Sequence, residues 1–349
     1  MSSLDPREDA IESSLTFEMK LPADIRDQSF HEAASHLRST MVPVDPSISP
    51  SEAVEVTYMY WSPVKNETTT VSPKLPVLLL HGFDGSSFEF RRLGPLLSGA
   101  GHPTYAVDAL GWGCADLTNI TDFSAKSKLE VLMEFWERIG ANGEVCIVGS
   151  SLGASLAVEF TNRHQQKSGV KEANGDHNIV KAVILISGHV VLVDGDFMKC
   201  LPISWIKFCV WLLGNPFLRQ FVDNLSRVDN GDADVKDSMK IWKARRDREG
   251  WEDAQISYMK SGGYSTSSKV PVLNKVPTLM IWGAGDRIAG SFGFPWIMKH
   301  IVPNSQTHPV ENCGHFPHLE KPEETAREIE AFLESKTHVN SKQSFVCQK

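Results

Sequence analysis

The chain has 349 residues, of which 41% are hydrophobic and 22% are charged, close to the average composition of a globular protein. This composition excludes disorder throughout, which requires few apolar residues and a high charge density. The 35 Lys plus Arg against 43 Asp plus Glu give a formal charge of −8, which argues against a nucleic-acid binder with a basic face. The length fits one large domain with an insertion, or two domains of about 150 residues each.

The first twenty residues are acidic and contain no apolar core of the signal-peptide type. The chain has no uninterrupted apolar run of about 18 residues, the length that spans a bilayer as a helix. We therefore expect no transmembrane segment and a cytoplasmic location. The sequence does not indicate an oligomeric state.

Residues 1–50 are interpreted as an N-terminal extension, with prolines, short apolar groupings and one helix near 29–39. Short apolar runs then alternate with helical stretches, which is typical of a parallel sheet covered on both faces. The strands are expected at 52–61, 76–80, 104–107, 144–148, 181–186 and 277–282. The helices between them are expected at 88–100, 124–139, 153–165 and 322–335. This pattern predicts an α/β doubly wound, mostly parallel sheet, with the chemistry in the loops that follow the strands.

The segment 189–270 interrupts the alternation, because it contains no clear strand and reads as helical. We interpret it as a helical cap inserted between two halves of the core, 51–188 and 271–336, with a tail at 337–349. Within the cap, residues 203–213 are apolar nearly all round, which is typical of a buried helix. The basic run 240–248 (KIWKARRDR) is expected to form a solvated helix face.

A serine between a strand and a helix is the first candidate for chemistry. Residues 149–153 (GSSLG) match the G-x-S-x-G pattern, after the apolar run EVCIV and before a helical run. The glycines allow a sharp turn that exposes the serine, and the helix N-terminus favours negative charge that develops in acyl transfer. The spacing selects Ser151 rather than Ser150 as the nucleophile. The structural alternative is a glycine-rich turn whose serines cap the helix.

A serine hydroxyl needs a base that takes its proton, and the base needs an orienting carboxylate. In the chain order serine, acid, histidine, two loop positions qualify: Asp286 after the run 277–282, and His315 before the last helix. Three alternatives remain open at this point, namely His318 as the base and Asp194 or Asp196 as the acid. Each candidate could also be an ordinary turn or surface residue.

Two backbone N–H groups are expected to stabilise the oxyanion. One belongs to Leu152, the residue after the nucleophile. The other is assigned to Phe83, in the loop HGFDGS that follows the apolar run 76–80. An ordinary glycine turn is the alternative for this loop.

Five segments in order carry a family resemblance: HGFDGSSFEFRRLGPLL, VDALGWGCADL, VGSSLGAS, WGAGDRI and NCGHFPHLEKPEE. Through them the chain resembles the α/β-hydrolase superfamily over about residues 52–336. LGWGCADL and WEDAQISYMKSGGYS are similar to a little-characterised group known mainly from plants and algae. The resemblance implies an inserted cap, the residues Ser151, Asp286 and His315 as a catalytic triad, and Phe83 and Leu152 as oxyanion donors. Because the elbow carries serine, aspartate-dependent epoxide hydrolases and haloalkane dehalogenases of this fold are excluded.

The leading hypothesis is a serine hydrolase that cleaves a small or medium apolar carboxylic ester, thioester or amide through an acyl-enzyme on Ser151. No metal or organic cofactor is expected, and no spacing of His and Cys suggests a metal site. The partner is expected to be a small apolar molecule. The alternatives are a C–C bond hydrolase with the same triad, a ligand-binding receptor, and a scaffold without activity.

Four cap aromatics are candidate pocket residues: Trp205, Phe208, Trp211 and Phe217. The alternative, which we favour from the sequence, is that they bury the cap against the core.

Overall fold

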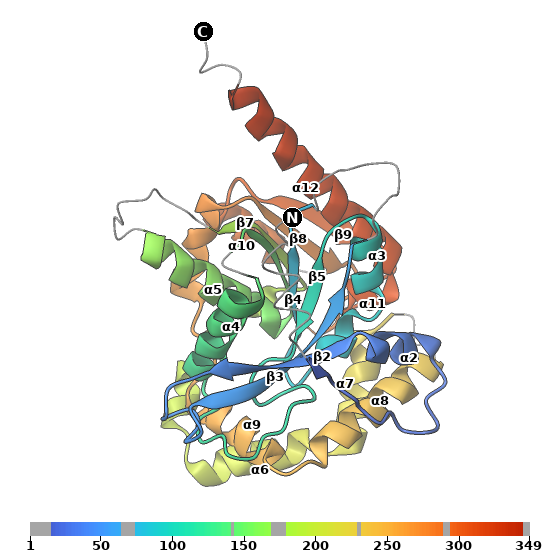
Figure 1. Cartoon of the computed structure of the whole chain (residues 1–349), viewed down its shortest axis with the longest axis vertical. Helices are drawn as coiled ribbons and strands as arrows, with labels where there is room; N and C mark the ends of the chain where they lie inside the picture. The colour runs from blue at the N-terminus through green and yellow to red at the C-terminus, as the bar shows by residue number, and fades with distance from the viewer. Residues whose placement is uncertain are drawn as a thin grey trace, which may run out of the picture.

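The computed structural model describes residues 15–63, 74–140, 143–168, 179–228, 232–288 and 294–344. A central sheet lies between layers of helices, and the helices of residues 203–260 gather at one end of the molecule (Figure 1). Within the described residues the sheet has nine strands, in the order β1-β2-β3-β5-β4-β6-β7-β8-β9.

The strands are β1 (Leu15–Thr16), β2 (Leu37–Pro43), β3 (Ala53–Trp61), β4 (Val77–Leu80), β5 (Thr104–Val107), β6 (Val145–Ser150), β7 (Val180–Ile186), β8 (Thr278–Gly283) and β9 (Gln306–Val310). Six neighbouring strands, in the sheet order β5-β4-β6-β7-β8-β9, pair in parallel. At one edge, β1, β2 and β3 pair antiparallel with their neighbours. The prediction of an α/β, mostly parallel sheet is confirmed.

The central strands are apolar on both sides because each side of the sheet carries its own core. In β4, Leu78 and Leu80 face one hydrophobic cluster, and Val77 and Leu79 face the other. All four side chains are at most 1% exposed. This alternation with a period of two residues explains why the strands read as continuous apolar runs.

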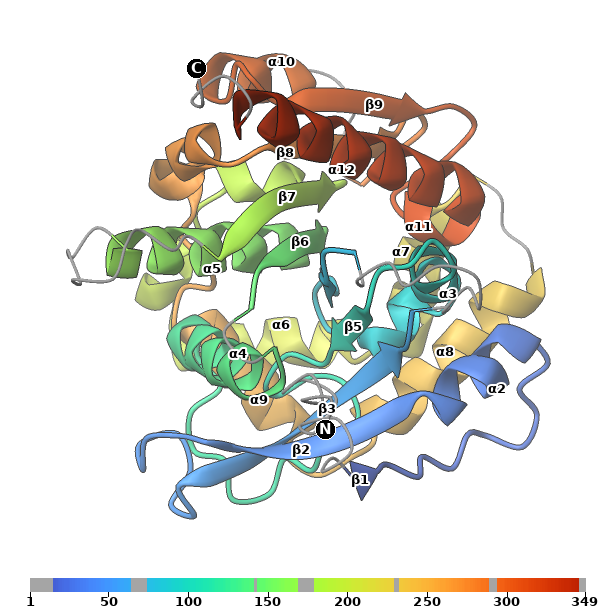
Figure 2. The same ribbon diagram turned by 45° about the horizontal axis from the view of Figure 1, so that its top comes forward.

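Helices cover both faces of the sheet, as the turned view shows (Figure 2). One face packs against α4 (Ala125–Ile139) and α5 (Leu152–Ser168), with α10 (Phe294–Ile301) at its edge. The other face packs against α2 (Gln28–Ser35), α3 (Leu93–Gly99) and α12 (Pro322–Ser344), which α11 (Pro317–Glu320) precedes. The chain passes to α3 after β4 and to α5 after β6. The helices that follow these two neighbouring strands therefore lie on opposite faces of the sheet. Sheets of this kind form their binding crevice at the carboxyl ends of such strands.

The segment expected to be an extension contributes to the sheet. Strand β2 pairs with β3 along its whole length, from Leu37 opposite Met59 to Pro43 opposite Ala53. The expected helix of this segment is present as α2. The sequence LRSTMVP did not predict a strand, because polar residues and a proline interrupt its apolar positions.

The described part of the segment 189–270 is mostly helical. It contains α6 (Ile203–Leu213), α7 (Pro216–Ser226), α8 (Asp232–Arg246) and α9 (Trp251–Lys260). Short 3-10 helices lie before them at His189–Leu192 and Asp196–Cys200, and after them at Ser267–Lys275; another, Ser87–Phe90, follows the loop after β4. Among the helices of the described segments, none has the length and apolarity required to span a membrane.

The expectation that residues 203–213 form a buried helix was wrong. Only Ile206 and Val210 of α6 are buried, against Trp251 of α9. Trp205 is 62% exposed and Phe208 54%. The apolar residues surround the helix, but only one edge of it meets the rest of the cap.

Candidate active site

The serine of the G-x-S-x-G segment occupies a strained turn between β6 and α5. Ser151 has a φ of +49°, a left-handed value that is uncommon outside glycine and concentrates at functional sites. The flanking glycines allow close packing around the turn. A Cβ on Gly153 would lie 2.1 Å from the carbonyl oxygen of Leu80, and one on Gly149 would lie 2.4 Å from that of Gly153. The two glycines therefore let the start of α5 approach β4, and Leu152 begins the helix with an N–H that has no intrahelical acceptor.

The structure brings Asp286 and His315 together. The carboxylate oxygen Oδ2 of Asp286 lies 2.7 Å from Nδ1 of His315, and the side chains are at most 6% exposed. The other oxygen of Asp286 accepts the N–H of Ile288 at 2.9 Å, which fixes the orientation of the carboxylate. The His315 N–H donates to the carbonyl of Ser226 at 2.5 Å, so the end of α7 supports the histidine loop.

The alternative acids and base have other partners. Asp194 is exposed and accepts hydrogen bonds from the N–H and the hydroxyl of Ser267. Asp196 pairs with Lys199 at 2.5 Å on the surface. His318 is fully buried, and its Nε2 lies 3.1 Å from Oε1 of Glu89. The geometry favours Asp286 and His315 over these residues.

The loop after β4 lies against the serine turn. A Cβ on Gly82 would be 3.3 Å from the Cβ of Ser151. The carbonyl of Gly82 accepts the N–H of Gly85 at 3.1 Å and lies 2.8 Å from Nδ1 of His81. Because a peptide is planar and trans, fixing this carbonyl also fixes the opposite direction of the Phe83 N–H.

The hydrogen-bond partners of His81 assign its protonation. Its Nε2 accepts the N–H of Ala109 at 3.0 Å, so the proton of the neutral ring is on Nδ1 and is donated to the Gly82 carbonyl. Burial lowers the pKa of His81, which keeps the ring neutral. This histidine therefore orients the peptide that carries the Phe83 N–H.

Glu89 contacts the same loop, and no sequence motif singled it out. Its Oε2 accepts the N–H of Gly82 at 3.1 Å, and it also contacts His318 and the hydroxyl of Ser150. Burial alone would raise the pKa of Glu89, but the hydrogen bond and charge of His318 outweigh it and lower the pKa to about 2. One carboxylate thus joins the loop after β4, the serine turn and the segment after His315.

His189, which follows β7, is a further residue that sequence reasoning missed. It is 9% exposed and lies within electrostatic range of Asp286 and His315. Burial lowers its pKa, so a neutral imidazole stands beside the pair.

The basic run 240–248 is solvated on one face only, at Lys243 and Asp247, and its other face is buried. Arg245 is 6% exposed and donates to the carbonyl oxygens of Asp84 and Gly85. Arg248 donates to three consecutive carbonyls, those of residues 113–115. These arginines attach the cap to loops of the core.

The four cap aromatics lie at the surface, and their expected burial against the core was wrong. Trp211 is 65% exposed and Phe217 is 84% exposed, and Trp205 and Phe208 are also more than half exposed. Trp211 lines a polar cavity between α6 and α9, whose lining does not include Ser151, Asp286 or His315. A role in the substrate pocket therefore stays a prediction.

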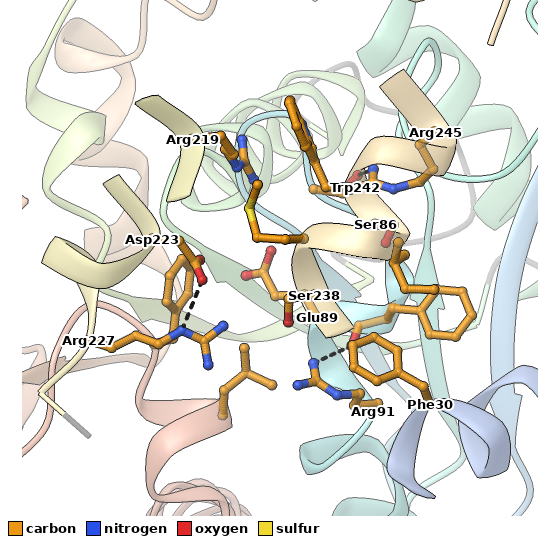
Figure 3. Close-up of a pocket in the computed structure, with 16 residues that line it drawn as sticks. Phe30, Ser86, Glu89, Arg91, Arg219, Asp223, Arg227, Ser238, Trp242 and Arg245 are labelled. Atoms are coloured by element: carbon orange, nitrogen blue, oxygen red, sulfur yellow. Dashed lines mark hydrogen bonds and ion pairs between the residues drawn. The ribbon is translucent and has the colours of Figure 1, made fainter. Parts of the chain in front are cut away.

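A small cavity of about 80 Å³ lies between the loop after β4 and helices α7 and α8 (Figure 3). Four arginines line it, namely Arg91, Arg219, Arg227 and Arg245. Arg91 and Arg227 both bond to the buried Asp234, and Arg227 also pairs with Asp223 at 3.6 Å. The cavity is therefore a contact between cap and core whose charges are largely neutralised.

The fold is a doubly wound α/β sheet whose loops carry Ser151 in a left-handed turn and the hydrogen-bonded pair of Asp286 and His315. The model of the alpha/beta hydrolase family matches residues 77–328. The chain belongs to this family.

Named relatives agree with that assignment. The chain is 31% identical over 265 residues to the alpha/beta hydrolase domain-containing protein VTE7 of Arabidopsis thaliana, covering 76% of each. It is 22% identical over 269 residues to Lipase 1 of Psychrobacter immobilis, covering 74% of this chain and 76% of the lipase. A solved esterase from Thermogutta terrifontis is similar in structure, with a TM-score of 0.66 at 16% identity over 85% of this chain and 98% of the esterase.

Proposed function

We propose that this member of the hydrolase family is a serine hydrolase that cleaves a carboxylic ester of a small or medium apolar substrate. The observation that carries the proposal is the buried hydrogen bond between Asp286 and His315, at the sheet edge where Ser151 occupies its left-handed turn. A carboxylate on Nδ1 leaves Nε2 of the histidine to act as the base.

In this mechanism Ser151 Oγ attacks the ester carbonyl as His315 Nε2 takes its proton. The N–H groups of Phe83 and Leu152 stabilise the oxyanion, and Asp286 stabilises the imidazolium. The proton then passes to the leaving alcohol, and a water molecule activated by His315 releases the acid from the acyl-enzyme. The aromatic contacts of Phe83 with Trp112 and Tyr258, at centroid distances of 5.3 and 6.1 Å, support an apolar acyl group.

The test is covalent labelling with a fluorophosphonate, with the site mapped by mass spectrometry, and turnover of p-nitrophenyl esters of graded chain length. We expect the label on Ser151. Ser151→Ala should lower kcat on the order of 10³- to 10⁶-fold. Ser150→Ala is the matched control: its hydroxyl is buried against Glu89, so this variant should still be labelled.

Three outcomes would contradict the proposal. Folded protein that takes no label would exclude an activated Ser151. Slow turnover with tight binding of one ligand would favour a receptor. Cleavage of a vinylogous diketone in preference to every ester would favour the C–C bond hydrolase.

A further inference from the structure

Asp84 directly follows Phe83, and its carboxylate bonds to residues of the cap. Oδ2 accepts the indole N–H of Trp242 at 2.7 Å. Oδ1 accepts the indole N–H of Trp251 at 2.9 Å and the amide of Gln255 at 3.1 Å. The residue is 3% exposed, so both carboxylate oxygens are enclosed by cap residues.

All three donors come from cap helices that are distant in sequence. Trp242 belongs to α8, whereas Trp251 and Gln255 belong to α9; they lie 158, 167 and 171 residues after Asp84. Arg245 of α8 adds two hydrogen bonds to the backbone carbonyls of Asp84 and Gly85, at 3.2 and 2.5 Å. Figure 3 shows Trp242 and Arg245 on the same helix above the loop.

The backbone at this position needs such support. Asp84 has a φ of +50°, a strained value for a residue with a side chain. A buried carboxylate is tolerated only when hydrogen bonds and charges compensate it, and here three N–H donors do so, with Arg219 at 3.7 Å. If the carboxylate lost its donors, the loop could relax to an ordinary backbone conformation.

We propose that Asp84 is a positioning residue through which cap helices α8 and α9 set the oxyanion loop. The Phe83 N–H is then aimed at the reacting carbonyl only while α8 and α9 donate their hydrogen bonds to the Asp84 carboxylate. This inference rests on the proposed function, because it assigns the Phe83 N–H to the oxyanion. It adds that the cap supports catalysis through the oxyanion loop.

The primary variant is Asp84→Asn, which keeps the shape of the side chain. Its NH₂ group would face an indole N–H, so one hydrogen bond becomes a clash of donors. We expect kcat to fall about 10- to 100-fold with little change in KM, because the oxyanion is stabilised only after binding. Hydrogen exchange of the amides of residues 82–86 should become faster.

The matched control is Asp234→Asn, which weakens a different buried contact between cap and core. Asp234 bonds to Arg91 and Arg227 and does not touch the loop after β4. This variant should lower the melting temperature while kcat and exchange at residues 82–86 stay near wild type. An equal fall of kcat in both variants would reduce Asp84 to a general stabiliser and overturn the proposal.

A milder variant covers the case in which Asp84→Asn does not fold. Trp242→Phe keeps an aromatic ring, although a smaller one, and removes the N–H, and it should reproduce part of the fall in kcat. Together with Asp84→Asn it forms a double-mutant cycle, and effects smaller than additive are expected. Strictly additive effects, or an unchanged kcat in Trp242→Phe, would show that Trp242 and Asp84 do not act through the same hydrogen bond, and would contradict the proposal.

The proposed function and this inference fail differently. If wild-type Ser151 takes no label, the serine hydrolase is wrong, yet hydrogen exchange still reports whether Asp84 orders the loop. If wild type is labelled and turns over substrate but Asp84→Asn has wild-type kcat and hydrogen exchange, only the positioning role of Asp84 is wrong.

Discussion

In the sheet core, apolar side chains on both faces of the strands are enclosed, and Leu78, Ile147 and Met280 have no exposed surface. The cap differs: its helix α6 encloses Ile206 and leaves Phe208 more than half exposed. The sheet is covered on two faces and needs apolar residues all along each strand. The outer cap helix packs along one edge only, so its remaining apolar residues contribute little to folding.

The contact between the two regions combines apolar packing, with Ile241 and Tyr258 in the core clusters, and buried polar bonds. Asp234 of α8 bonds to Arg91 of the core, and Arg248 bonds to the carbonyls of residues 113–115. Apolar packing tolerates small shifts, whereas hydrogen bonds fix direction and leave costly unpaired groups when one partner is lost. The position of the cap should therefore be more sensitive to single polar substitutions than the sheet.

The largest effect is expected in the core, from Asp286→Asn. The variant keeps the shape of the side chain but no longer holds the histidine in the tautomer that accepts the serine proton. We expect kcat for an ester to fall about 10⁴-fold with stability nearly unchanged. Asp194→Asn is the control, because Asp194 bonds only to Ser267 in the surface loop and should have wild-type activity. A reversed result would assign the acid to Asp194.

The next effect tests the polar contact. Asp234→Ala removes the carboxylate that the buried guanidinium groups of Arg91 and Arg227, 4% and 5% exposed, share. It leaves them only the longer pairs with Asp27 at 3.8 Å and Asp223 at 3.6 Å. We expect the free energy of unfolding to fall by about 3–5 kcal/mol, measured by urea denaturation. Asp196→Ala removes the exposed pair with Lys199 and should change stability little. Similar curves for the two variants would mean that the buried contact does not hold the cap.

The sequence predicted the parts of the fold and site whose signals are local. Buried parallel strands read as apolar runs, and Ser151, Asp286 and His315 each stand in a loop with a recognisable neighbour sequence. Asp84 and Glu89 could not be found this way, because their roles depend on partners such as Trp242, 158 residues away from Asp84. The burial of helix α6 was predicted wrongly, because an apolar sequence does not determine how much of the helix surface its neighbours cover.

Two positions two residues apart on α6 sharpen the contrast within the cap. Ile206 has no exposed surface and packs in the cluster with Trp251, so Ile206→Ala should lower the free energy of unfolding by about 2–4 kcal/mol. Phe208 is 54% exposed, so Phe208→Ala should stay within about 0.5 kcal/mol of wild type. Thermal and urea unfolding measure both. An equal loss at Phe208 would mean that this face of α6 is covered in solution.

The smallest expected effect is on the pH dependence of stability, and it comes from Glu89, a buried carboxylate of the core. The pKa of Glu89 falls from an ordinary 4.5 to about 2, so its ionised form stabilises the fold above pH 4.5, and this contribution is lost as pH falls toward 2. Glu89→Gln should therefore flatten the loss of stability between pH 4.5 and 2, followed as melting temperature against pH. The control is Glu144→Gln, whose side chain is 60% exposed and pairs with Lys181, and it should keep the wild-type profile. Because Glu89 also bonds to the Gly82 N–H, its variant should lose activity at neutral pH as well, which a carboxylate that only stabilises the fold would not do.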